Sequence, residues 1–390
     1  MSSAAVKMSK ERKVDCGPEP AVRPILILTI ANGAAHTQAA KAIAAAWRDL
    51  HPNIPARIVE VSDYMSRKAR FTHVTAYLWL VKNAPRVWEN IDSYQKRQTQ
   101  TSPIWFYRRE CKKLFDLVRE IEPSAIVATE VGCGEIASLI KRDLQLQVPL
   151  VAVSLDYDAD RAWIQPEIDL YCLATPLVEK EFLKLGASPD KIETWGVPLG
   201  SDFKRLNEMR RTAKRKKVCY WLELDPEKPI LLIAGGGEGL GKIEAVVNQL
   251  LHLPIQMVVL AGHNKKLKAR CEKIGFKKRV RVLGWTEKVS DLMNAADILI
   301  SKLGLTFYES MTCGLPIVAL EPPPGAERIQ HALLENFGVG RAVRSLEEMS
   351  QAVHELLNDE ILLKKMREKT AFLGQPQASE KLVSWMRERI

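Results

Sequence analysis

Short apolar runs separated by helical patterns recur along the whole chain. The first half contains five of them: Pro24–Ile30, Ala56–Val61, Ala125–Thr129, Pro149–Leu155 and Leu170–Ala174. The second half contains five more: Ile230–Ala234, Gln256–Ala261, Val280–Leu283, Ile298–Ser301 and Pro316–Leu320. Runs with little polar alternation are typical of parallel strands that are buried on both faces. Because strands and helices alternate in both halves, the sequence predicts two doubly wound α/β domains.

Glycine is most concentrated directly after the strand Ile230–Ala234. The loop contains Gly235, Gly236, Gly237, Glu238, Gly239, Leu240 and Gly241, and a helical pattern begins at Lys242. Glycine lets the backbone approach a ligand closely, and the first N–H groups of a helix face its negative charge. We interpret this loop as the site for the diphosphate of a nucleotide-sugar. The alternative is a tight turn that binds no ligand.

Polar loops follow the other strands of the second half, where open α/β sheets bind ligands. These loops contain His263, Trp285, Ser301, Gly304 and Thr306. Serine, glycine and threonine at a helix start predict a second phosphate-binding surface. Glu309 lies one turn into that helix and is a candidate to accept both ribose hydroxyls; the alternative is an exposed helix residue. The proline-rich loop Glu321–Glu327 ends in an acid that suits sugar hydroxyls.

The first half offers three candidates for a general base. His36 is the strongest, because it follows a small-residue loop beside a helix N-terminus, a position that favours the neutral imidazole. The alternative is a surface or capping histidine. Glu130 and Asp160 are rivals, because they also follow strands of this half. Asn32 and Gly33 share the loop with His36, before a helical pattern that begins at Thr37, and are candidates to contact an acceptor or a phosphate.

Aromatic and basic residues are interleaved between Tyr64 and Leu117. This mixture suits an anionic membrane surface, while base stacking and phosphate contacts are an alternative use. A third interpretation is a pair of helices with an aromatic core and solvated charges. Because no nucleic-acid reader motif is present, we expect no nucleic-acid partner.

Composition narrows the class of partner and the compartment. The chain has 390 residues, enough for two domains, and its net charge of +10 favours an acidic or phosphorylated partner. Its seven cysteines are dispersed without a CxxC pair, which indicates reduced thiols in the cytoplasm and no metal site. No apolar run is long enough to span a membrane, and because the first 20 residues lack the apolar region of a signal peptide, none is expected. Any membrane contact is therefore expected to be peripheral.

Three motifs of the second half occur together. They are GGGEGLGKIE at Gly235–Glu244, AGHNKKL at Ala261–Leu267, and ISKLGLT at Ile300–Thr306, which Glu309 follows. Together they resemble the monogalactosyldiacylglycerol synthase and processive diacylglycerol glucosyltransferase family. EPPPGAE at Glu321–Glu327 resembles the sugar loop of that family, and WGVP at Trp195–Pro198 resembles the end of its first domain.

The resemblance implies the GT-B fold, in which two Rossmann-like domains face a cleft, as in the peptidoglycan lipid-intermediate N-acetylglucosaminyltransferases. Residues 23–203 would form the acceptor- and membrane-binding domain, and residues 229–374 the nucleotide-sugar-binding domain. Residues 1–22 are expected to be a disordered tail and residues 204–228 a basic linker. Residues 375–390 would form a helix that crosses back onto the first domain.

Several positions depart from the family pattern. Asp160 stands where the family has histidine, in a run where Asp156, Tyr157 and Trp163 match. This makes Asp160 a candidate partner for the acceptor hydroxyl or for His36. Ala326 replaces the glutamine of the sugar loop, whereas Glu327 is kept. The departures lie at sugar and acceptor contacts, so the sequence supports the activity class better than a particular sugar or lipid.

The resemblance implies an inverting glycosyltransferase that needs neither metal nor cofactor. It would move galactose or glucose from a UDP-hexose to diacylglycerol at the inner face of the cell membrane, with His36 as the base. The first alternative is an N-acetylglucosaminyltransferase or other glycosyltransferase with a polyprenyl-linked or other lipid acceptor. The second is a membrane protein that binds UDP-sugar without catalysis. The sequence does not specify glucose or galactose, processivity or an oligomeric state.

Overall fold

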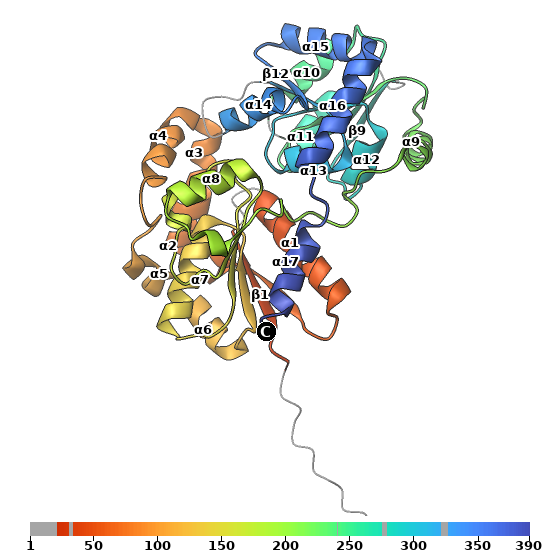
Figure 1. Cartoon of the computed structure of the whole chain (residues 1–390). Helices are drawn as coiled ribbons and strands as arrows, with labels where there is room; N and C mark the ends of the chain where they lie inside the picture. The colour runs from red at the N-terminus through yellow and green to blue at the C-terminus, as the bar shows by residue number, and fades with distance from the viewer. Residues whose placement is uncertain (1–21, 31–33, 240, 275–278, 321–326) are drawn as a thin grey trace, which may run out of the picture.

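The computed structural model of the chain contains two domains, each built around a parallel sheet (Figure 1). It describes residues 22–30, 34–239, 241–274, 279–320 and 327–390. The predicted fold class, two Rossmann-like domains with a returning C-terminal helix, is confirmed by these sheets and by the packing described below. Most of the predicted tail, Asn32, Gly33 and Ala326 lie outside the described residues.

The first sheet has the strand order β2-β1-β3-β4-β5-β6, and all of its pairs are parallel. Its strands are β1 Ile25–Thr29, β2 Ala56–Glu60, β3 Ala125–Ala128, β4 Leu150–Val153, β5 Leu170–Cys172 and β6 Ile192–Glu193. The first five match the predicted apolar runs. All residues of β1, β3, β4 and β5 are buried, which explains why these runs lack polar alternation.

The second sheet has the order β12-β11-β10-β7-β8-β9 and is also parallel throughout. Its strands are β7 Ile230–Ala234, β8 Gln256–Leu260, β9 Val280–Leu283, β10 Ile298–Ser301, β11 Ile317–Leu320 and β12 Gly340–Val343. The strands β7 and β10 lie side by side at the centre, so their loops emerge next to each other. The edge strand β12 was not among the predicted runs.

Helices connect and cover the two sheets. Those of the first domain are α1 Ala34–Leu50, α2 Arg67–Arg70, α3 Ala76–Asn83, α4 Pro85–Gln95, α5 Ile104–Glu110, α6 Lys112–Ile121, α7 Val131–Asp143 and α8 Pro176–Lys184. The second domain has α10 Ile243–Leu250, α11 Lys265–Glu272, α12 Val289–Ala295, α13 Leu305–Cys313, α14 Glu327–Asn336, α15 Leu346–Asn358 and α16 Glu360–Leu373. The remaining two are α9 Glu208–Leu222 and α17 Ala378–Arg387.

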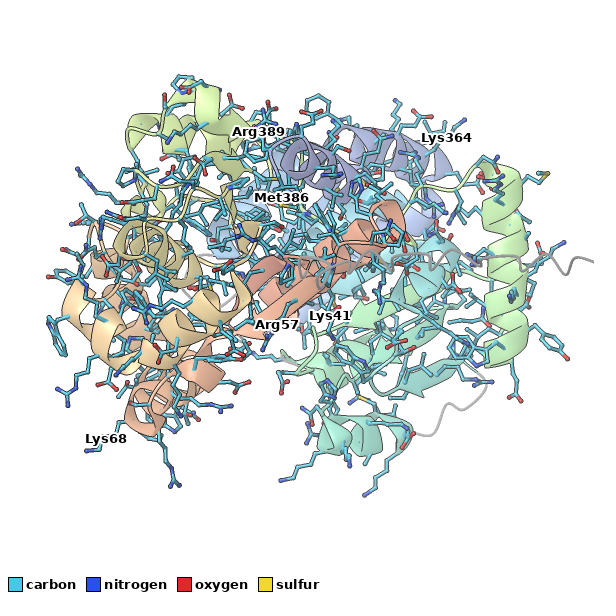
Figure 2. The ribbon with its side chains drawn as sticks, turned by 90° about the horizontal axis from the view of Figure 1, so that it is seen from below. Lys41, Arg57, Lys68, Lys364, Met386 and Arg389 are labelled. Carbon is cyan, nitrogen blue, oxygen red and sulfur yellow. The ribbon has the colours of Figure 1, made fainter. Side chains whose placement is uncertain are left out.

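The C-terminal helix α17 packs on α1 of the first domain (Figure 1). Leu382, Val383 and Met386 are fully buried in the same apolar cluster as Ile43 and Trp47. Figure 2 labels Met386 among the side chains of α17. The chain therefore crosses between the domains a second time after α16.

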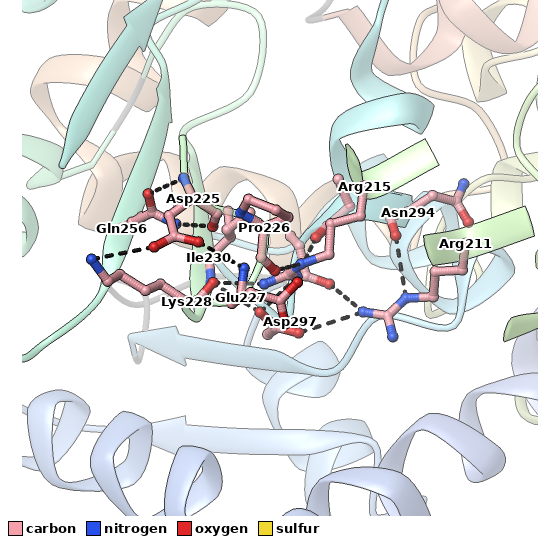
Figure 3. Close-up of polar contacts among 12 residues, drawn as sticks. Arg211, Arg215, Asp225, Pro226, Glu227, Lys228, Ile230, Gln256, Asn294 and Asp297 are labelled. Atoms are coloured by element: carbon pink, nitrogen blue, oxygen red, sulfur yellow. Dashed lines mark hydrogen bonds and ion pairs between the residues drawn. The ribbon is translucent and has the colours of Figure 1, made fainter. Parts of the chain in front are cut away.

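Helix α9 occupies residues 208–222 of the predicted basic linker and packs on α12. Its basic residues divide between two faces. Lys216 and Lys217 are exposed, whereas Arg211 and Arg215 reach the carboxylate of Asp297 (Figure 3). Arg211 also donates to the carbonyl oxygens of residues 294 and 296, and Arg215 to those of residues 226, 228 and 295. This inward face fixes α9 to the second domain.

Candidate active site between the two domains

Loops at the carboxyl ends of the two sheets meet between the domains. A Cβ placed on Gly237 would lie 3.3 Å from the Cβ of Ala34, so the glycine loop touches the start of α1. Tyr157 follows β4, and its hydroxyl donates to the carbonyl oxygen of Gly304 at 2.8 Å. These contacts bring the predicted phosphate loops next to the predicted base.

His36 lies in the first turn of α1, because the helix begins at Ala34 rather than at Thr37 as the sequence pattern predicted. Alanine has the highest helix propensity, so the two alanines before His36 extend the helix. The Nδ1 atom of His36 lies 2.6 Å from the carbonyl oxygen of Thr129. Since a carbonyl oxygen only accepts, Nδ1 carries the proton in this bond. The other nitrogen, Nε2, then has the lone pair that a general base needs.

Glu130 is the N-cap of α7, and its carboxylate accepts a hydrogen bond from the backbone N–H of Cys133 at 3.1 Å. Burial raises the pKa of Glu130, while the charge of His36 opposes that rise. One of its oxygens is therefore already engaged in capping α7.

Asp160 belongs to an acidic group around Lys96. The Lys96 ammonium lies 2.6 Å from Asp158 and 3.2 Å from Asp92. In the described part of the chain, the buried Oδ1 of Asp160 has no hydrogen-bond partner. Burial, followed by the charge of Asp156, raises the pKa of Asp160 to about 7. Burial also raises the pKa of Asp156, to about 6.

Replacing Asp160 with asparagine is expected to stabilise the fold more at pH 8 than at pH 5, by a difference on the order of 1–2 kcal/mol. The raised pKa means that the folded state binds the proton more tightly than the unfolded chain does. The stability from this group is therefore fully present only below the ordinary pKa of 3.8, falls as the pH rises, and is lost once the pH has passed about 7. Urea unfolding at both pH values measures the effect.

Asp158→Asn is the matched control, because it removes the charge that pairs with Lys96. This variant should lose stability at pH 8. Equal changes in D160N at pH 5 and pH 8 would contradict a carboxyl group that is protonated near neutral pH.

The glycine loop is held by the loop after β8, in which the sequence analysis named His263 but not Gly262. Gly262 has a φ of +57°, and a Cβ there would lie 2.1 Å from the carbonyl oxygen of Gly237. The backbone N–H of His263 donates to that oxygen at 2.8 Å. Gly236 and Gly239 also have positive φ angles, 70° and 56°. Only glycine adopts this combination without strain, which explains why glycine is required at these positions.

His263 and Trp285 form a stacked pair with ring centroids 4.4 Å apart and an angle of 10° between the rings. Trp285 is 44% exposed and contacts Gly237. Glu238, the polar residue of the glycine loop, is exposed. An exposed indole face beside a diphosphate loop offers a stacking surface for a planar base.

The second predicted phosphate surface lies at the start of α13. Gly304 is its N-cap with φ 82° and ψ −150°, and Thr306 is in the first turn. Ser301 is buried, and its hydroxyl donates to the carbonyl oxygen of Lys302 rather than pointing freely to a ligand. Burial, followed by Asp202, raises the pKa of Glu309 to about 7. Glu309 is partly buried, in contrast to the exposed alternative.

Glu327 is the first residue of α14. Within the described residues, no group of three or more His, Cys, Asp or Glu side chains is arranged to hold a metal ion. The six cysteines in the described ranges are buried and free. In the same ranges, no helix is both long and apolar enough to cross a bilayer.

Two family models match the chain, one in each domain. Residues 36–199 match monogalactosyldiacylglycerol (MGDG) synthase, and residues 222–371 match glycosyl transferases group 1. The processive diacylglycerol beta-glucosyltransferase of Bacillus licheniformis is 28% identical, over 92% of this chain and 93% of its own. The enzyme of the same name from Bacillus subtilis is 27% identical, over 91% and 92%. The resemblance found in the sequence motifs is thereby confirmed.

Solved structures support the fold. MurG of Acinetobacter baumannii has a TM-score of 0.59 at 14% identity, covering 94% of this chain and 99% of that one. Anabaena Alr3699/HepE in complex with UDP-glucose has a TM-score of 0.56 at 14% identity, covering 94% and 98%. The UDP-GlcNAc 2-epimerase of Neisseria meningitidis reaches 0.60 at 16% identity, covering 94% and 100%. Since the fold hosts more than one reaction, the chemistry must be argued from the site.

Proposed function

We infer that this chain is a GT-B glycosyltransferase of the monogalactosyldiacylglycerol synthase type, and we propose that it transfers a hexose from UDP-hexose to diacylglycerol. The observation that carries the proposal is the position of His36. Its Nδ1–H is engaged by the carbonyl oxygen of Thr129, and its helix starts against the glycine loop across the domain interface. A base and a diphosphate site thus face one another.

The reaction is a single displacement. His36 Nε2 takes the proton of the lipid hydroxyl as its oxygen attacks the anomeric carbon on the face opposite UDP. The bond from that carbon to the diphosphate oxygen breaks, and UDP leaves with the electron pair. Backbone N–H groups of the glycine loop and the N-terminus of α13 stabilise the charge that develops on the diphosphate. Glu130 stabilises the imidazolium that forms.

The donor occupies the second domain. Trp285, stacked on His263, provides the surface for uracil, and Glu309 accepts the ribose hydroxyls. Glu327 accepts hydroxyls of the sugar, in the loop where Ala326 replaces the glutamine of the family. We propose that the acceptor binds to the first domain, residues 23–203, and that the donor binds to the second domain, residues 229–374. We propose no cofactor and no metal for this reaction.

The acceptor domain has exposed apolar side chains between residues 71 and 105, and we propose that this region contacts the membrane. We define it by Phe71, Trp79, Val87, Tyr94 and Trp105, each more than half exposed. Arg67, Lys68 and Arg70 lie beside it on α2, and Lys68 projects from the molecule in Figure 2. Apolar rings with adjacent cations insert into the headgroup region of anionic bilayers. We therefore propose that the protein works at the inner face of the cell membrane, as a cytoplasmic peripheral protein.

Replacing Trp105 with serine is expected to weaken binding to anionic vesicles about 10-fold, because an indole 63% exposed can no longer enter the bilayer. Vesicle sedimentation at two salt concentrations measures the partition coefficient. Trp221→Ser is the matched control, since Trp221 is 42% exposed on α9, which lies on the side away from α3 and α4 (Figure 1). Equal losses in both variants would contradict this membrane surface.

The proposed activity is tested with liposomes that contain diacylglycerol and an anionic lipid. UDP-glucose and UDP-galactose are supplied separately, with and without EDTA, and the lipid product is identified and quantified by mass spectrometry. A hexosyl diacylglycerol from one donor, undiminished by EDTA, supports the proposal. UDP binding without any lipid product would favour a polyprenyl-linked acceptor or a binding protein without catalysis.

A further inference from the structure

One side chain of the acceptor domain reaches the phosphate loop of the donor domain. Tyr157 follows β4 and donates from its hydroxyl to the carbonyl oxygen of Gly304 at 2.8 Å. Its ring stacks on Tyr308 with centroids 5.1 Å apart and an angle of 13°, and meets Phe307 edge-on at 5.7 Å. Both of those rings are buried in the first turn of α13. Tyr157 therefore holds the start of α13 at three points.

The loop that carries Tyr157 is itself fixed. The ammonium of Lys96 binds Asp158 at 2.6 Å, and the backbone N–H of Arg161 donates to the carbonyl oxygen of Lys96 at 3.1 Å. On the other side, the N–H of Asp156 donates to the Ser154 hydroxyl at 3.4 Å. These contacts hold the loop that carries the Tyr157 hydroxyl in place next to Gly304. Ligand binding therefore needs to order little of this loop.

The hydrogen bond from Tyr157 sets the orientation of the peptide group between Gly304 and Leu305. In a trans peptide, the carbonyl oxygen and the following N–H point in opposite directions. The Gly304 oxygen accepts from Tyr157 and from the N–H of Phe307 at 3.0 Å, so it points into the helix. The N–H of Leu305 in the same peptide then points out of the helix N-terminus. That direction is toward the proposed diphosphate.

We infer that Tyr157 is a positioning residue that aims the Leu305 N–H at the donor diphosphate and so couples the acceptor loop to donor binding. The inference rests on the proposed function, because it needs UDP at the start of α13. Gly304 has a backbone conformation that L-residues with side chains rarely adopt, so this peptide has other orientations open to it. Tyr157 selects one of them.

The test is calorimetric binding of UDP to the full-length protein and to Tyr157→Phe. The variant keeps the ring and loses the hydrogen bond to the Gly304 oxygen, so the Kd for UDP should rise about 2–10-fold. Tyr171→Phe is the matched control, since the Tyr171 hydroxyl donates to the backbone carbonyl of Gln165 within the first domain, at 3.2 Å. It should leave the Kd for UDP unchanged.

A double-mutant cycle distinguishes an effect on the orientation of the Gly304–Leu305 peptide group from a general effect on packing. Gly304→Ala disturbs the same peptide from the donor side, so adding Y157F to G304A should weaken UDP binding less than Y157F does alone. Equal UDP affinity in wild type and Y157F, equal weakening in Y157F and Y171F, or full additivity with G304A would each overturn the inference.

The outcomes also distinguish this inference from the proposed function. If the wild type binds UDP but makes no glycolipid, the proposed transfer fails, and the UDP affinities of the variants still decide the role of Tyr157. If Y157F binds UDP as the wild type does while glycolipid is made, the inference fails alone. A wild type that does not bind UDP overturns both.

Discussion

Replacing His36 with alanine is expected to lower kcat by about 10²–10⁴-fold while the Kd for UDP stays close to that of the wild type. In the proposed displacement, the Nε2 atom of His36 accepts the proton, because Nδ1 donates to the carbonyl oxygen of Thr129. The proposed donor site lies on the other domain, so removal of the ring should leave its contacts in place. Glycolipid formation on liposomes gives kcat, and calorimetry gives the Kd for UDP.

His354→Ala is the control for this experiment, since His354 is exposed on α15 in the second domain. Its kcat should match that of the wild type. A His36→Ala enzyme that keeps more than about half of its kcat would contradict the base assignment, and a loss shared by both variants would indicate a general effect of removing histidine.

Replacing Asp297 with alanine is expected to destabilise the protein by about 3 kcal/mol, because removal of a carboxylate whose side chain is only 18% exposed leaves three largely buried guanidinium groups without their counter-charge. The carboxylate lies 2.9 Å from Arg215, 3.1 Å from Arg367 and 3.5 Å from Arg211. It also accepts the backbone N–H of Ile230, the first residue of β7, at 2.9 Å. Burial, followed by the charge of Arg211, lowers the pKa of Arg367 to about 10.

The position of Asp297 explains why its replacement should also weaken the proposed UDP site. It precedes β10 and binds β7, the two strands that lead to Ser301 and to the glycine loop. It also binds α9 and α16, which lie next to the two crossings between the domains. Urea unfolding followed by tryptophan fluorescence measures the free energy of unfolding. UDP affinity at low urea should fall as well.

Asp291→Ala is the matched control, because Asp291 also receives a cation of α9, that of Lys214. Both members of that pair are about one-third exposed, so their separation should cost less than about 1 kcal/mol. Similar losses in D297A and D291A would mean that Asp297 contributes one ordinary ion pair rather than an anchor for four elements.

The sequence predicted the central strands and the loops that follow them, because buried parallel strands leave continuous apolar runs. It missed β6, which has only two residues, and β12, whose sequence contains Gly340 and Arg341 and so lacks a continuous apolar run. The start of α1 was placed three residues late, since the small residues before His36 suit a loop as well as a helix. Only the structure shows His36 within the first turn.

The contacts between distant segments could not be predicted from local pattern. From the sequence alone, the basic run of α9 is interpreted as a solvated charge cluster. The structure shows that Asp297, more than 80 residues after Arg215, pairs with it. Tyr157 matched a family motif, but its partner Gly304 lies 147 residues away on the other domain. Gly262 was missed because its neighbour is the backbone of Gly237 rather than a nearby residue.

In the proposed displacement, a lipid hydroxyl attacks the anomeric carbon on the face opposite UDP, so the configuration of this carbon inverts. The most direct measurement is proton NMR of the anomeric centre in glycolipid formed from a UDP-α-hexose and diacylglycerol in liposomes. A β-linked product is expected, and it should disappear in His36→Ala. An α-linked glycolipid, or free hexose as the main product, would contradict it.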